Sequence, residues 1–159
     1  MSRLLEVILM MLLAVVNSNV EAALIDEAIT VEREIAGKDA RQEFLDGAKA
    51  VIEAYRKLQS KIEAGANYGD FQKAYQDAEK ELAAFKNSPG GRYKDTKYDN
   101  FWSGLALANQ SYANAETFWR MSIFKLNDRR LKKEAITHVE ESWVMAKDEV
   151  DKATASLSQ

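Results

Sequence analysis

The sequence predicts an all-α fold, an antiparallel bundle of four to five helices that follows a cleaved signal peptide. Two observations predict the helices: the chain has one proline and seven glycines in 159 residues, and its apolar residues recur three and four positions apart. A third observation, an apolar run close to the N-terminus, predicts export. The chain has no cysteine, which excludes disulfides, thiolate metal sites and cysteine nucleophiles.

The N-terminal segment has the three-part layout of a secretory signal peptide. A cation, Arg3, precedes the apolar run 7–16, and polar residues follow it. We expect cleavage after Ala22, so that residues 1–22 are the signal peptide and residues 23–159 form a single domain. The alternative is an uncleaved anchor, but the run is about half of the roughly 20 residues that span a membrane. The expected location is therefore the periplasm or outside the cell, and membrane contact is expected only through an uncleaved N-terminus.

Three helices are expected in the first half of the chain. The first spans residues 23–36 and ends at Gly37. The second begins at Asp39, whose side chain is a favourable N-cap, and ends near Gly65. The third follows Asp70 and ends before the strongest break in the chain, the run NSPGG.

Two longer helices are expected in the second half. After the loop 87–98, which contains the NSPGG run, the first of them spans residues 99–125. Asp128 is the predicted N-cap of the other, which continues to residue 156. The chain would thus form two helical hairpins, residues 39–86 and residues 99–156, in a bundle with shallow crossing angles.

The two predicted hairpins share a faint internal repeat. In each of them a phenylalanine is followed by a glycine three positions later and by a tyrosine eight positions after the glycine. The positions are Phe44, Gly47 and Tyr55 in the first hairpin and Phe101, Gly104 and Tyr112 in the second. This spacing suggests an old duplication, but three matching positions easily arise by chance.

The segment 98–124 is rich in aromatic residues and raises the choice between a core and a binding surface. Eight of its residues fall within an arc about 100° wide, as expected for a core face; they are Tyr98, Phe101, Leu105, Ala108, Tyr112, Ala115, Trp119 and Ile123. Five large side chains lie off this stripe: Trp102, Leu107, Phe118, Met121 and Phe124. Four of them, all except Leu107, are the candidate surface for a ligand or a partner. Counting equal distances from a turn at Asn127 predicts that Phe101 lies level with Ala153.

A second candidate site is a cluster of cations at the start of the last helix. The residues are Arg129, Arg130, Lys132 and Lys133. The helix dipole disfavours positive charge there, so the cluster is a candidate for binding an anionic headgroup, a phosphate or an acidic partner, although a solvated turn is the alternative. The whole chain has a formal net charge of −3, which gives no electrostatic reason to expect nucleic acid as a partner.

No arrangement of residues in the sequence predicts catalysis. His138 is the single histidine, so one chain contains no Ser-His-Asp triad and no two-histidine metal motif. Glu134 and Glu141 share its helix face, and ordinary ion pairs are the expected role of all three. We therefore expect no metal, no cofactor and no enzymatic activity.

These observations together predict an exported, non-catalytic helical bundle that acts as a protein-interaction or self-assembly module. The expected partner is another protein or a second copy of the chain. The alternative is a periplasmic carrier of a small apolar ligand, with an aromatic-lined pocket between the helices. The residues expected around that pocket are Trp102, Tyr112, Trp119 and Trp143.

Overall fold

The computed structural model of the chain describes residues 37–158. The predicted signal peptide and its cleavage site, and the predicted helix 23–36, lie outside the described residues. The chain divides into two compact units, Met1–Ala40 and Arg41–Gln159. Four helices packed together form the second unit.

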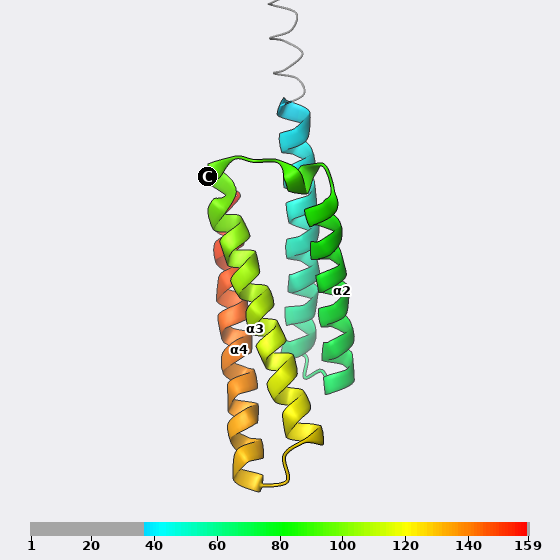
Figure 1. Cartoon of the computed structure of the whole chain (residues 1–159), viewed down its shortest axis with the longest axis vertical. Coiled ribbons are helices and arrows are strands. Elements are labelled where there is room, and N and C mark those ends of the chain that lie inside the picture. Colours follow the sequence, from blue (N-terminus) through cyan, green and yellow to red (C-terminus); the bar gives the residue numbers. More distant parts are fainter. Residues whose placement is uncertain (1–36, 159) are drawn as a thin grey trace, which may run out of the picture. The chain divides into compact units, whose positions relative to one another are not determined.

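Helices that follow one another in the chain run in opposite directions in the second unit (Figure 1). Residues 37–63 are helical, and the part from Arg41 onward is the first helix of the bundle. The other three helices are α2 (Tyr68–Asn87), α3 (Asp99–Phe124) and α4 (Arg129–Ser156). Two short 3-10 helices, η1 (Gly90–Arg92) and η2 (Thr96–Tyr98), lie between α2 and α3. No strand occurs in the described part of the chain, which confirms the prediction of an all-α bundle.

Two predicted helix starts are wrong. Gly37, Lys38 and Asp39 are all helical, so Asp39 is not an N-cap. The helix α2 begins before Asp70, because the Asn67 side chain is its cap: Oδ1 of Asn67 accepts from the Asp70 amide at 3.0 Å.

The start of the last helix agrees with its prediction. Oδ1 of Asp128 accepts hydrogen bonds from the amides of Arg130 at 2.7 Å and Leu131 at 3.0 Å. These bonds satisfy amides at the helix start that have no partner within the helix. The preceding helix, α3, ends at Phe124, one residue before the predicted end.

The connection between α2 and α3 lies against the first helix. A Cβ atom on Gly90 would lie 2.7 Å from the backbone of Glu43, so only glycine fits at this contact. Nε of Arg41 donates to the Tyr98 hydroxyl at 3.2 Å. The Tyr98 ring stacks on Phe44 with 4.2 Å between ring centroids. The connection therefore covers one end of the core.

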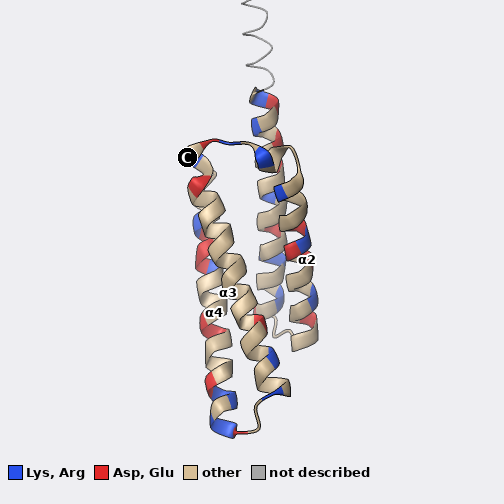
Figure 2. Ribbon diagram, in the orientation of Figure 1, with Lys and Arg blue, Asp and Glu red and all other residues tan. Residues whose placement is uncertain are grey.

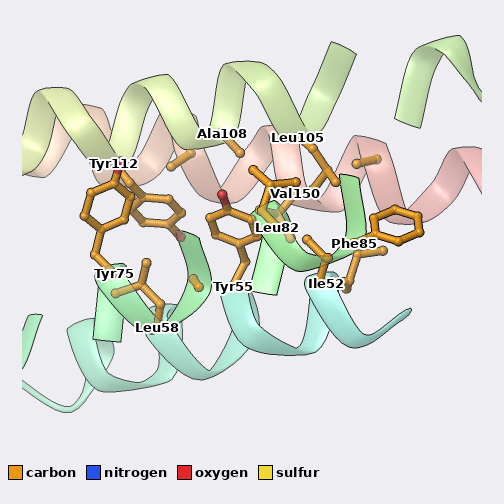
Figure 3. Packing of buried hydrophobic residues seen from close by; sticks show 14 of the residues in the cluster. Ile52, Tyr55, Leu58, Tyr75, Leu82, Phe85, Leu105, Ala108, Tyr112 and Val150 are labelled. Carbon is orange, nitrogen blue, oxygen red and sulfur yellow. The ribbon is translucent and has the colours of Figure 1, made fainter. Parts of the chain in front are cut away.

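Aromatic and aliphatic side chains from all four helices fill the core (Figure 3). Six of the eight residues of the predicted core face are buried: Tyr98, Phe101, Leu105, Ala108, Tyr112 and Ala115. Trp119 is partly buried against the same cluster. The prediction is wrong for Ile123, whose side chain is 45% exposed. The core face of α3 therefore loses its cover towards the C-terminal end of the helix.

Equivalent positions of the internal repeat meet in the core. The ring centroids of Phe44 and Phe101 are 5.5 Å apart in an edge-on arrangement. The rings of Tyr55 and Tyr112 stack with centroids 5.6 Å apart and planes 10° apart. The first helix and α3 therefore face each other through the same residues of the two hairpins.

The two glycines of the repeat occupy corresponding places as well. Each approaches the second helix of its own hairpin, Gly47 at Phe85 and Gly104 at Ala153. Because Gly104 lies level with Ala153, the prediction that Phe101 does so is off by one helical turn. Counting equal distances from a turn neglects the inclination of packed helices, which shifts the residues that lie level.

The pattern of buried residues extends this correspondence over both hairpins. Five buried positions of the first helix have a buried counterpart in α3, 57 positions later. The positions Phe44, Ala48, Val51, Tyr55 and Leu58 correspond to Phe101, Leu105, Ala108, Tyr112 and Ala115. Five buried positions of α2 have a buried counterpart in α4, 68 positions later. The positions Phe71, Ala74, Ala78, Leu82 and Phe85 correspond to Val139, Ser142, Ala146, Val150 and Ala153. The two offsets differ by 11, so the second hairpin has 11 additional residues around its turn.

Candidate functional site

The additional residues form the tip of the second hairpin. By the two offsets, residues 121–135 stand where the first hairpin has only the turn 64–67, and we call residues 121–135 the tip. Eleven residues shared between two helices lengthen the hairpin by about 8 Å at 1.5 Å per residue. Figure 1 shows α3 and α4 extending past the turn that joins the first helix to α2.

The tip exposes an unusual share of large apolar side chains. Eight such side chains are exposed in the described part of the chain, and four of them belong to the tip. The four, with their exposed fractions, are Met121 at 37%, Ile123 at 45%, Phe124 at 69% and Leu131 at 42%. Single exposed apolar residues are common, but four within one short segment make the tip a candidate contact surface.

The same segment is strongly cationic (Figure 2). It contains five cations, Lys125, Arg129, Arg130, Lys132 and Lys133, against two anions, Asp128 and Glu134. The tip thus has a net charge of +3, whereas the whole chain has −3, which leaves −6 on the remainder. Among the described residues, Arg130 alone of the five cations is in an ion pair, with Glu134 at 3.4 Å.

A polar contact fixes the base of the tip to α2. The Tyr68 hydroxyl donates to Oε1 of Glu116 at 2.6 Å, and the Tyr68 ring lies edge-on to Trp119 and Phe124. Burial of the hydroxyl, together with the hydrogen bond to Glu116, raises the pKa of Tyr68 to about 12. Tyr68 therefore stays protonated as a donor at neutral pH and holds α3 where the first hairpin ends.

The structure brings parts of the two predicted sites together. Met121 and Phe124 stand at the end of α3, and all four cations of the anion-binding candidate, residues 129–133, stand at the start of α4. The turn 125–128 between the helices is short. Apolar and cationic side chains that the sequence presented as separate candidates therefore share one end of the hairpin.

The other two residues of the predicted surface lie elsewhere. Trp102 is partly buried, and its ring stacks on Phe85 with centroids 5.1 Å apart. It precedes Met121 by 19 positions, which is about 28 Å along a helix. Phe118 is partly buried, with its ring centroid 5.0 Å from that of His138. Both rings have partners within the chain, and a role for them in binding stays a prediction.

Sequence reasoning missed two residues of the tip surface. Ile123 was assigned to the core face, and Leu131 was not singled out. The signal that identifies them is the difference in hairpin length, because the core face of a helix becomes an exposed face where the opposite hairpin ends. The burial pattern shows this difference and the sequence does not, because only Ala78 and Ala146 are identical among the five pairs of α2 and α4.

A cavity of about 220 Å³ between the first helix, α3 and α4 is a second candidate site. Its walls include Tyr55, Tyr112, Gln59 and Lys147. The Tyr55 hydroxyl donates to Asn109 at 2.8 Å and the Tyr112 hydroxyl donates to Gln59 at 3.0 Å. Lys147 pairs with Asp151 at 2.8 Å. Because these groups already have hydrogen-bond or ion-pair partners within the chain, the cavity offers weaker support for a ligand site than the tip does.

His138 is exposed and contacts one carboxylate of its own helix. Its Nδ1 atom lies 3.0 Å from Oε2 of Glu141, and Glu134 is paired with Arg130 instead. Among residues 37–158 no group of three or more histidine or acidic side chains is arranged to hold a metal ion. Nor is any helix in that range long and apolar enough to cross a membrane.

No protein-family model, curated protein or solved structure matches this chain.

Proposed function

We propose that the protein is a non-catalytic interaction module that works through the tip of its second hairpin. The observation that carries the proposal is the coincidence of four exposed apolar side chains and four unpaired cations in residues 121–135. Exposed apolar area and clustered like charge both fail to stabilise a folded chain. The first hairpin completes its share of the core without such an extension, so folding does not explain the tip.

The charge of the tip restricts the partner. Two tips with a charge of +3 each repel one another, so tip-to-tip self-association is disfavoured. An acidic surface is favoured instead. The three-part layout of residues 1–22 supports export, and we place the interaction in the periplasm or outside the cell.

The carrier alternative has less support. Its expected pocket residues pack on one another or on nearby rings: Trp119 and Trp143 are 5.1 Å apart between centroids, and Tyr112 is fully buried beneath Tyr55. A ligand among these rings would have to displace core contacts, and burial of each ring is worth several kcal/mol, about 3–5 for truncation to alanine.

Photo-crosslinking in the source cells tests the proposal. A photoreactive amino acid is placed at position 124 or 131 in the tip and, as matched controls, at positions 144 and 145. The controls replace Val144 and Met145, which are 63% and 60% exposed but lie outside the tip. We expect adducts from the tip positions and not from the controls. Equal yields at all four positions, or none from the tip, would reject the tip as the working surface.

A further inference from the structure

We infer that the surface bound by the tip is an anionic lipid bilayer, contacted from one side and not crossed. The inference rests on the proposed function and specifies its partner. It starts from the shape of the site. The exposed apolar residues belong to the end of a helical hairpin that extends beyond the turn of the first hairpin (Figure 1), and a protruding end suits a broad, deformable surface better than a groove does.

The composition of the tip matches that surface. Interfacial segments combine aromatic and aliphatic side chains, which enter the boundary of the acyl chains, with lysine and arginine, which pair with anionic headgroups. Phe124, Ile123 and Leu131 supply the first group, and Lys125, Arg129, Lys132 and Lys133 supply the second. The long basic side chains keep their charges at the headgroup level while their methylene groups lie against apolar surface.

The dimensions and the remaining charge agree with shallow insertion. Interfacial helices bury their apolar faces by about 5–10 Å, and the tip extends past the first hairpin by about 8 Å. The first hairpin would therefore stop at the headgroups. Without the predicted signal peptide, the chain outside the tip still has a net charge of −5, which an anionic surface repels, so the electrostatic field orients the protein with its tip towards the bilayer.

Vesicle flotation with the full chain tests the inference, using pure phosphatidylglycerol and pure phosphatidylcholine vesicles. A charge variant, Lys132→Gln with Lys133→Gln, is compared with the control Lys73→Gln with Lys86→Gln, which removes two exposed lysines of α2. An apolar variant, Ile123→Ser with Leu131→Ser, is compared with Val144→Ser with Met145→Ser. Every variant keeps the same N-terminus, so a difference between a variant and its control arises at the substituted positions.

The expected result is preferential binding to phosphatidylglycerol that weakens as salt is raised. Each lysine near an anionic surface contributes about a five-fold factor in partitioning, so the charge variant should bind about 25-fold more weakly and its control should change little. The apolar variant should also bind phosphatidylglycerol vesicles more weakly than the unmodified chain, whereas its control should bind as the unmodified chain does. Circular dichroism of all variants separates weak binding from unfolding.

Two results overturn the inference. One is equal binding to both lipids, and the other is equal loss in tip and control variants. If vesicles are not bound but positions 124 and 131 still crosslink to an acidic protein, the lipid inference fails and the proposed function stands. If those positions give no adduct of any kind, both fail.

Discussion

Substitution of Gly104 by valine tests the packing of the second hairpin. A Cβ atom at this position lies 3.0 Å from Cβ of Ala153 and 3.0 Å from the carbonyl oxygen of Glu149. Neither atom can rotate away, because one is carbonyl backbone and the other is attached directly to Cα. Helix propensity favours valine over glycine by about 0.4 kcal/mol, whereas overpacking at a close contact costs about 1–3 kcal/mol. We expect the free energy of unfolding to fall by about 2 kcal/mol.

Urea unfolding followed by circular dichroism measures this change. The matched control is Ala106→Val on the exposed face of the same helix, which should lose only the propensity difference, about 0.6 kcal/mol. Adding Ala153→Gly to Gly104→Val should recover part of the lost stability, since it removes one of the two clashing atoms. The reasoning is refuted if Gly104→Val is as stable as the unmodified chain or more stable.

Two further predictions concern the core. The indole N–H of Trp143 is buried and has no hydrogen-bond partner in the described chain. In the same urea assay, Trp143→Phe should therefore change the free energy of unfolding by less than about 1 kcal/mol, whereas Trp143→Ala should lower it by about 3–5 kcal/mol. Equal losses in the two variants would mean that the N–H is bonded. Burial raises the pKa of Tyr55, Tyr75 and Tyr112 well above the ordinary value, with Glu79 adding to the effect for Tyr55 and Tyr75 and Asp151 for Tyr112. Stability should therefore be constant up to about pH 10 and then fall by about 1.4 kcal/mol per tyrosine per pH unit, because only the unfolded chain ionises. Replacing the three tyrosines by phenylalanine should flatten this loss in urea titrations, and an unchanged alkaline slope would show that other groups cause it.

The fold was predictable where its signals are local. The four-three spacing of apolar residues and the NSPGG break gave the four described helices, and the Asp128 cap marked the start of α4. Asp39 shows where local signals fail. A favourable cap residue is only a permissive signal, and a helix continues through it when the neighbouring residues also favour helix.

The site was predictable in its parts and not as a whole. Spacing along a helix shows which residues share a face, but not how far the neighbouring helix reaches along that face. Trp102 lies off the main stripe of α3 and is nevertheless covered, because Phe85 of α2 packs on its ring. Ile123 lies on the stripe and is exposed, since the first hairpin ends before it. Both outcomes depend on how far the first hairpin reaches along α3, and the spacing of residues within α3 alone does not show this.

Shortening the second hairpin tests most directly the claim that its tip serves binding and not folding. Residues 121–135 are replaced by Ala-Gly-Ala-Asn, the sequence of the first hairpin's turn at 64–67, so that the two hairpins become equal in length. Thermal unfolding and vesicle flotation are then measured on the shortened and the full chain. The account predicts a cooperatively folded helical bundle that no longer binds phosphatidylglycerol vesicles. A folded variant that binds as the full chain does would contradict it, and so would a variant that cannot fold, because the tip would then be part of the core.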